Sequence, residues 1–396
     1  MKIKLIIIAL FLLSAGGCAK PVEKYGRISE DETWEGKILL AGDVYIERNV
    51  KITVTAGTGI TYSDGEIRHE IQRITSHGPA TYNIFRENQI ELIIDGDIDM
   101  QGTQDYPVKM YVSKELDSRA GGISFVGEKS SSTITWLELS GGYTGIRIYN
   151  SRAPDISSTT ISGTAIAAIG CWNRARPHIS YSEVRGNKYG IGASDLALPV
   201  IRNSKIINNS ASGVFFEGES RGIITDSVID GNNVGVACGN SARPQMTSSK
   251  ITGNGSGVGL WDDSWAVIES NTFTDNLVGV LSLDSSSGEV INNDFRNNGG
   301  GVTMDDEASG EIRGNIFRGH KAGVITRNTG AAEITDNTFM NNEYGIRTEL
   351  RSVPVISGNH FEANKGGVLF VGSSAPEVSE NSFTDNLNEI IDNRGK

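Results

Sequence analysis

The sequence predicts an all-β solenoid, because one repeat of 22 residues runs through its C-terminal half almost without slippage. Apolar residues in the repeat are β-branched or aromatic and occur in short runs, which favours strands over helices. Each repeat is expected to form one coil of three short strands and to bury its apolar face by stacking on its neighbours. A Gly followed by Val or Ile marks position 1 of each repeat, at Gly213, Gly235, Gly257, Gly279, Gly301, Gly323, Gly345 and Gly367.

The three strands are expected at positions 1–5, about 10–13 and about 15–18 of each repeat. Position 17 holds Phe from Phe273 to Phe383, and position 15 holds Asn from Asn271 onward. Position 20 also holds Asn in the regular repeats, except at His320. Equivalent residues of stacked coils lie about 4.8 Å apart, so the amides are expected to bond to one another as ladders. Since Asn tolerates a left-handed backbone, the same two positions are predicted to form corners.

The motif Asn-x-Phe-x-x-Asn-x-x-Gly-Val resembles the right-handed parallel β-helix, the architecture of pectate lyases, polygalacturonases and polysaccharide epimerases. Coils of 22 or 23 residues begin near Gly122 and continue to the end of the sequence. We therefore predict a right-handed parallel β-helix of about twelve 22-residue coils. The repeat motif is specific for this architecture and carries no information about chemistry.

The N-terminal residues are predicted to target the chain. Lys2 and Lys4 precede nine apolar residues, too few to span a bilayer, and small residues follow up to Cys18. This pattern resembles a bacterial lipoprotein signal, which implies cleavage before Cys18 and lipid attachment to that residue. The residue after Cys18 is Ala19 and not Asp, which resembles the signal that sorts lipoproteins to the outer membrane of a Gram-negative cell.

Four segments follow from these patterns. Residues 1–17 are predicted to be the signal peptide, and residues 18–33 the lipidated Cys and a polar tether. Residues 34–121 are predicted to form N-terminal capping coils, with a charged insertion at residues 63–89 that breaks the pattern. Residues 122–396 are predicted to form the regular repeats.

The composition excludes some classes of partner. The formal net charge is −12 at pH 7, which disfavours nucleic acid. Some related β-helix proteins serve copper delivery to nitrous-oxide reductase, but six Met, five scattered His and no Cys-x-x-Cys do not favour copper here. Cys171 and Cys238 fall three coils apart, about 14 Å from the strand spacing, which is beyond the ~7 Å between Cα atoms that a disulfide allows.

An acidic patch is predicted in the turn after the first strand. Asp262, Asp284 and Asp306 recur at position 6 of consecutive repeats, and Asp305 lies beside them. Stacked carboxylates need solvent, a cation or a raised pKa, and Ca²⁺ favours several carboxylate oxygens. These four residues are therefore the candidate metal ligands. The alternative is that they are turn residues, a role that Asp favours.

The same patch gives the catalytic candidates Asp284, Asp306 and Arg327. With Arg327 one coil above Asp305, the arrangement resembles a pectate lyase, in which Ca²⁺ holds the uronate and an Arg abstracts the proton. A pair of carboxylates could instead act as acid and base in glycoside hydrolysis. The sequence has only fragments of the polygalacturonase motifs and lacks the Asp-Pro-His-Asp of alginate epimerases.

Outward positions 3 and 5 of the first strand are rich in apolar residues, which water disfavours when they form a contiguous patch. The alternative is that they are scattered singly as ordinary strand residues. Trp261 and Trp265 could stack on sugar rings, and Arg347 occupies an outward position of the same strand series. The binding candidates are Phe215, Trp261, Trp265, Leu281, Leu283 and Arg347.

The leading functional hypothesis is a lipid-anchored, non-catalytic module of the cell envelope that binds or scaffolds a polysaccharide or a protein partner. The only cofactor that the sequence suggests is Ca²⁺ at the acidic patch. The alternative is an enzyme acting on acidic polysaccharide: a Ca²⁺-dependent lyase or, failing that, a hydrolase or epimerase. A third hypothesis treats the C-terminal edge as a site of end-to-end association.

Overall fold

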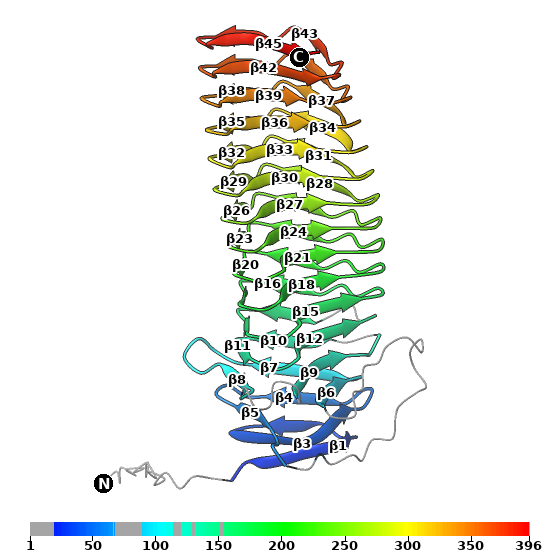
Figure 1. Cartoon of the computed structure of the whole chain (residues 1–396). Helices are drawn as coiled ribbons and strands as arrows, with labels where there is room; N and C mark the ends of the chain where they lie inside the picture. The colour runs from blue at the N-terminus through cyan, green and yellow to red at the C-terminus, as the bar shows by residue number, and fades with distance from the viewer. Residues whose placement is uncertain are drawn as a thin grey trace, which may run out of the picture.

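Equivalent residues of successive repeats stack in parallel and build a rod (Figure 1). The structure, a computed structural model, describes residues 20–65, 67, 89–113, 120–128, 131–150 and 154–395. Every strand pair in it is parallel, and the strands form three ladders that run the length of the rod. The described residues contain strands and turns and no helix. The predicted all-β solenoid is therefore confirmed.

The first ladder contains position 1 of each repeat. β1 (Val22–Ile28) and the long β3 (Lys37–Ile46) begin both the first and the third ladder, because β3 pairs with β6 at one end and with β5 at the other. The other strands of the first ladder are β6 (Ile90–Ile94), β9 (Ala120–Phe125), β12 (Thr144–Tyr149), β15 (Ala167–Trp172), β18 (Tyr189–Ala193), β21 (Ser212–Phe216), β24 (Val234–Cys238), β27 (Ser256–Leu260), β30 (Val278–Ser282), β33 (Gly300–Met304), β36 (Ala322–Thr326), β39 (Tyr344–Thr348), β42 (Gly366–Gly372) and β45 (Asn388–Arg394).

The second ladder forms a sheet of its own with fifteen strands. They are β2 (Glu32–Trp34), β4 (Lys51–Val54), β7 (Asp97–Gln101), β10 (Thr133–Thr135), β13 (Asp155–Ser157), β16 (His178–Ser180), β19 (Val200–Arg202), β22 (Ile223–Thr225), β25 (Gln245–Thr247), β28 (Trp265–Glu269), β31 (Ser287–Ile291), β34 (Ser309–Arg313), β37 (Ala331–Thr335), β40 (Val355–Ser357) and β43 (Glu377–Ser379).

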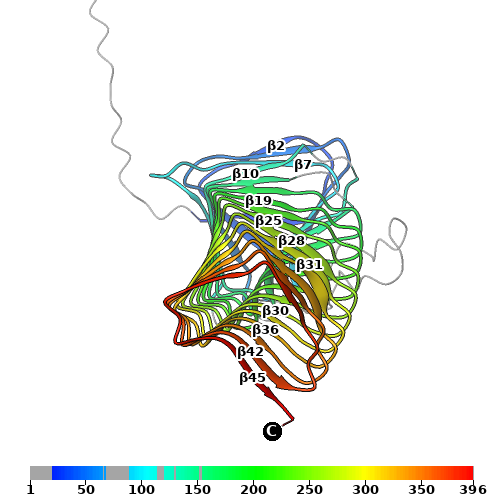
Figure 2. The same cartoon turned by 90° about the horizontal axis from the view of Figure 1, so that it is seen from above.

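The third ladder contains the Phe column and completes each coil. Its strands are β5 (Gly59–Tyr62), β8 (Val108–Tyr111), β11 (Leu137–Ser140), β14 (Thr160–Ser162), β17 (Glu183–Arg185), β20 (Lys205–Ile207), β23 (Val228–Asp230), β26 (Lys250–Thr252), β29 (Thr272–Thr274), β32 (Asp294–Arg296), β35 (Ile316–Arg318), β38 (Thr338–Met340), β41 (His360–Glu362) and β44 (Ser382–Thr384). Seen along the axis, successive coils lie over one another with a gradual rotation (Figure 2).

The fifteen strands of the second ladder correspond to fifteen coils, three more than the twelve predicted. The prediction counted from Gly122, where the spacing becomes regular. Earlier coils lack the Gly-Val marker but still pair in register, as Val44 with Leu92 and Leu92 with Ile123 show. At about 4.8 Å a coil the rod is roughly 70 Å long.

The interior of the rod is filled by columns of identical or similar side chains. Six Phe from Phe273 to Phe383 stack with ring centroids 4.7 to 5.0 Å apart, and five of them are fully buried. Burial of each ring stabilises the fold by about 1.5 to 3 kcal/mol. Cys171 and Cys238 are free thiols buried in the core, and burial raises the pKa of both.

Two Asn ladders run beside the apolar columns, as predicted. Asn293 Nδ2 donates to Asn315 Oδ1 at 3.0 Å and to the Ile268 carbonyl at 2.8 Å, and Asn315 repeats the pattern one coil on. The prediction that the same Asn also form the left-handed corners is wrong. The left-handed residues come one position earlier: Asn292 has φ 54° and Asn297 has φ 52°, whereas the ladder residues do not have positive φ.

The predicted signal peptide, Cys18 and most of the insertion at residues 63–89 lie outside the described residues. The described part of residues 34–121 contains β3 to β8 and so forms coils of the same solenoid, while β1 and most of β2 lie within residues 18–33. No helix long and apolar enough to cross a bilayer occurs in the described part of the chain.

Candidate functional site

The outer face of the first ladder carries the predicted apolar residues at positions 3 and 5 of its coils. Position 3 of each coil is paired with position 3 of the next, which places Gly259 beside Leu281, Leu281 beside Thr303, and Thr303 beside Ile325. Leu281 and Ile325 are half-buried, in contrast to the inward residues of the same strands, which are fully buried. We call this column, with its neighbours at position 5, the apolar stripe: Phe215, Trp261, Leu281, Leu283 and Ile325.

Aromatic rings on this face lie flat on the sheet where a Gly leaves room. A Cβ on Gly259 would come within 2.2 Å of the Trp261 ring, and a Cβ on Gly192 would come within 2.2 Å of the Phe215 ring. Neither Gly has a positive φ, so the constraint there is the close approach of the ring. Both rings therefore keep one side on the sheet and are half-buried.

The face also holds aromatic residues that sequence reasoning missed. Tyr149 and Trp172 stack with centroids 5.0 Å apart and an interplanar angle of 17°, and the Trp172 ring lies over Gly170. Tyr189 meets the Phe215 ring edge-on at 5.2 Å. A signal was present in the sequence, since both Trp residues on this face stand two positions after a first-ladder Gly.

Two of the predicted binding residues, Trp265 and Arg347, are not part of the apolar stripe. Trp265 belongs to β28 of the second ladder, so the turn after Trp261 separates it from the apolar stripe. Arg347 does lie on the first-ladder face, between Ile325 and Leu369, and its guanidinium is paired with the Glu349 carboxylate.

The acidic residues at position 6 have a local structural role. Asp262, Asp284 and Asp306 are exposed and left-handed, with φ of 55° to 56°. Asp284 Oδ2 accepts the Asp262 N–H at 3.2 Å, and Asp262 Oδ2 accepts the Asn240 N–H at 2.8 Å. Each of these two carboxylates therefore holds the turn of the preceding coil.

Asp305 is the least exposed of the four acidic candidates, with 12 % of its side chain accessible. Its Oδ2 accepts a hydrogen bond from Arg327 Nε at 2.5 Å, and its Oδ1 accepts one from Asn328 Nδ2 at 2.5 Å and one from the Asp306 N–H at 2.9 Å. The carboxylate thus has three donors around it. Arg327 forms an ion pair with Asp305, Asp306 is the next residue in the chain, and Asp284 lies one coil below.

The positions of these acidic side chains bear on the predicted metal site. Among the described residues, no three His, Cys, Asp or Glu side chains come close enough together to hold a metal ion. The four predicted ligands, Asp262, Asp284, Asp305 and Asp306, are distributed over three coils, and each of them accepts a hydrogen bond from a backbone or side-chain donor.

A buried charged cluster lies on the N-terminal coils and was not predicted. Arg147 Nη2 donates to Glu91 Oε1 at 2.8 Å, and Ser124 Oγ donates to Glu91 Oε2 at 3.2 Å. Burial raises the pKa of Glu91 to about 7, Arg147 opposes the shift, and Asp43 adds to it. Gly121 gives the Glu91 side chain its room, because a Cβ there would approach Glu91 Cγ to 2.3 Å.

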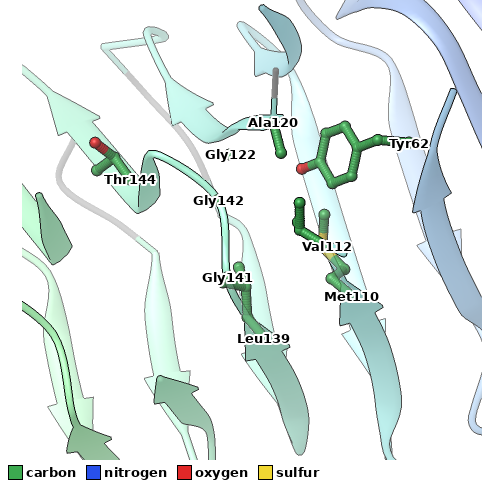
Figure 3. Close-up of a pocket in the computed structure, with 9 residues that line it drawn as sticks. All are labelled: Tyr62, Met110, Val112, Ala120, Gly122, Leu139, Gly141, Gly142 and Thr144. Carbon is green, nitrogen blue, oxygen red and sulfur yellow. The ribbon is translucent and has the colours of Figure 1, made fainter. Parts of the chain in front are cut away.

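Beside this cluster, the Tyr62 ring points toward Ala120, Val112 and Met110 (Figure 3). The space that these residues enclose with the neighbouring glycines is too small for a water molecule. Burial is also the main cause that raises the pKa of the Tyr62 hydroxyl. The region is close-packed core and offers no ligand cavity.

Comparison with known protein families identifies the architecture. Residues 256–395 match the family model described as "Right handed beta helix region". Together with the three parallel ladders, this match decides the handedness. The chain is a right-handed parallel β-helix protein.

A second family model, described as "Periplasmic copper-binding protein (NosD)", matches residues 110–299 of the β-helix. Comparison with curated protein sequences finds no significant match.

Several solved β-helix structures are similar to the chain. The A-module of the mannuronan C-5 epimerase AlgE4 from Azotobacter vinelandii is 15% identical, with 86% of this chain and 88% of that chain covered and a TM-score of 0.43. Pectate lyase Pel9A is 12% identical, with 89% and 79% covered and a TM-score of 0.36. The surface protein and adhesin PfbA from Streptococcus pneumoniae is 12% identical, with 91% and 90% covered and a TM-score of 0.29. Identities and TM-scores this low say nothing about the chemistry of the chain.

Proposed function

We propose that this β-helix is a binding or scaffold module of the cell envelope that engages a polysaccharide or a protein partner along the apolar stripe. One observation carries the proposal: Leu281 and Leu283 of one coil and Ile325 two coils further on stay half-exposed on a face whose backbone is fixed by ladder hydrogen bonds. Water disfavours apolar side chains gathered on one exposed face, and a rigid face loses little conformational entropy when it binds an extended ligand.

Two observations support the cell envelope as the location. The sequence before residue 20 resembles a lipoprotein signal with Cys18 as the lipidated residue. The family matched by residues 110–299 is described as periplasmic, which fits a location in the envelope. Anchoring of Cys18 in the outer membrane is part of the proposal.

Copper, which the description of that family names, does not fit the described residues. Copper sites use His, Cys and Met side chains that converge on one point. Cys171 and Cys238 are buried in separate coils, and His320 is buried with both ring nitrogens against backbone carbonyls. We therefore assign no step to copper in this chain.

The alternative function is an enzyme that acts on acidic polysaccharide, and one observation favours it. Asp305 and Arg327 form an ion pair on the face that also carries Trp261, so a charged group and an aromatic ring share one surface. The hydrogen bonds of the Asp305 and Asp306 carboxylates argue for a structural role instead. In the enzyme hypothesis Asp284, Asp306 and Arg327 would be the groups required for turnover, with Ca²⁺ as the ion that holds the substrate.

Site-directed photo-crosslinking tests the proposal. We expect a photoreactive amino acid at position 281 of the full chain, produced in intact Gram-negative cells, to give a discrete adduct with envelope material. The same group at position 355, where Val355 is 36 % exposed on the second ladder, is the control. Equal labelling at both positions, or no adduct at position 281, would contradict binding by the stripe.

An activity assay separates the two functions. Polygalacturonate and alginate are incubated with the chain and Ca²⁺, and unsaturated uronate products are followed by absorbance. We expect no turnover. Product formation that is lost in Asp284→Ala and Arg327→Gln would replace the binding proposal with the enzyme.

A further inference from the structure

The turns between the first and second ladders carry a cluster of arginines that form no ion pair with any described carboxylate. Nine of the sixteen described Arg pair with a carboxylate. Of the described Arg without such a pair, four gather at this corner in a chain of net charge −12. They are Arg174, Arg176, Arg221 and Arg243, and all four are exposed. In a net-acidic protein, such a concentration of unneutralised positive charge favours an anionic ligand.

The corner is hollowed. A groove of about 310 Å³ is lined by Arg174, Arg176, Leu196, Leu198, Glu219 and Arg221. This volume lies at the lower end of the range typical of small-molecule sites. We call it the arginine groove.

Hydrogen bonds between coils hold the groove in shape. The Leu198 N–H donates to the Ala175 carbonyl at 2.8 Å, and the Arg221 N–H donates to the Ala197 carbonyl at 3.0 Å. The three turns therefore lie in register, about 4.8 Å apart. Arg174 and Arg176 belong to one turn, the leucines to the next, and Arg221 with Glu219 to the third.

The middle turn is apolar and faces solvent. Leu196 is 44 % exposed and Leu198 is half-buried, so two aliphatic side chains lie between the guanidinium groups of the flanking turns. The only carboxylate that lines the groove among the described residues is Glu219, and three guanidinium groups outnumber it. The Asp195 carboxylate of the middle turn accepts the Asn173 N–H at 3.0 Å.

These features select one ligand chemistry. Guanidinium groups bind carboxylate or phosphate oxygens with paired hydrogen bonds. They are positively charged donors, so they do not bind a metal cation. Exposed leucines favour an aliphatic body, whereas the groove has no aromatic ring for a neutral sugar to stack on. We propose that the arginine groove binds an anionic amphiphile, in which an oxyanion reaches Arg176 and Arg221 and an aliphatic chain covers Leu196 and Leu198.

The inference does not depend on the apolar stripe, which lies on the first-ladder face. The equivalent turn positions of the next coils hold Asp263, Ser285, Glu307 and Thr329, and Arg351 follows as a single basic residue, so the arginines are clustered only at the arginine groove.

Calorimetric titration tests the proposal with the chain from Lys20 on, which contains every described strand. Octanoate is expected to bind with one site per chain. Acetate, which lacks the aliphatic body, and octanol, which lacks the charge, are expected to bind at least about tenfold more weakly. Binding of octanoate is expected to weaken as salt rises, since exposed charges are screened.

Variants assign the binding to the groove. Arg176→Gln combined with Arg221→Gln should weaken octanoate binding by about tenfold, the order expected for two partly exposed charge contacts. Glu219→Gln should tighten binding by a few fold, a gain that misfolding cannot produce. Arg202→Gln, which removes an exposed and unpaired Arg of β19, and Leu281→Ser on the apolar stripe should both leave binding unchanged.

Two sources of the ligand are separated with vesicles. Cosedimentation with phosphatidylglycerol vesicles but not phosphatidylcholine vesicles, lost in the double Arg variant, would assign the groove to a membrane headgroup. Octanoate binding without cosedimentation would assign it to a free amphiphile. No saturable octanoate binding, equal affinity for acetate, or preference for an acidic peptide over octanoate would overturn the proposal.

Discussion

Substitution of two adjacent asparagines in one coil is expected to change stability to very different extents. Asn293 belongs to a buried ladder, whereas Asn292 is exposed and left-handed with φ 54°. We predict that Asn293→Ala destabilises the fold strongly and that Asn292→Gly is nearly neutral, since Gly adopts a left-handed backbone without strain.

The magnitude follows from the contacts of Asn293. Its Nδ2 donates to the Ile268 carbonyl at 2.8 Å and to Asn315 Oδ1 at 3.0 Å. Its Oδ1 accepts the Asn271 N–H at 2.9 Å and Asn271 Nδ2 at 3.2 Å. Four hydrogen bonds at about 1 kcal/mol each give a loss of roughly 4 kcal/mol, because their partners stay buried without replacements.

Urea unfolding followed by far-UV circular dichroism measures the loss. We expect a lower midpoint with an unchanged m-value for Asn293→Ala. Amide hydrogen exchange adds a local readout, since repeat arrays can open part by part. Protection should fall in the coils that contain Ile268 and Asn315. A loss below about 1 kcal/mol, or an equal loss for Asn292→Gly, would refute the ladder as a main source of stability.

Three further predictions concern titration and metal binding. Burial lowers the pKa of His320, so the folded state releases its proton more readily than the unfolded state and stability falls as pH drops below about 6.5. His320→Asn, which restores the ladder, should raise the free energy of unfolding at pH 5 by about 1 kcal/mol, and an unchanged pH profile would contradict this. Burial raises the pKa of Glu91 to about 7, so the folded state holds its proton more tightly and stability falls as pH rises from about 4.5 to about 7; Glu91→Gln should flatten that part of the denaturation profile. Millimolar Ca²⁺ should leave the thermal midpoint unchanged, because Asp284 already accepts a backbone N–H; a saturable rise that Asp284→Ala abolishes would favour the lyase.

Much of the fold follows from the sequence because the repeat places the same side chain in each coil. The Phe column and both Asn ladders were predicted from position alone, and the structure pairs them residue by residue. The corners were misplaced by one residue because Asn suits both a buried ladder and a left-handed turn. Where two Asn follow one another, as at Asn292 and Asn293, the sequence does not show which side chain points inward to the ladder and which residue forms the left-handed turn.

The site was harder to predict. Sequence register placed Asp262 and Asp284 in one column, but it could not show that each carboxylate accepts the N–H of the coil below. The arginine groove was missed for another reason. Its charges come from two turns separated by a turn with Leu196 and Leu198, so no single repeat shows a basic motif.

Coil-by-coil pairing gives the rod a length that changes only in whole steps. Each strand hydrogen-bonds to the equivalent strands of its two neighbours, so duplication or loss of one 22-residue unit would move every later surface by about 4.8 Å along the axis. The interior columns would close over the junction with the same side chains as before. Evolution can therefore adjust the reach of this protein from its N-terminal end to any docking surface by copying units, without selecting a new core.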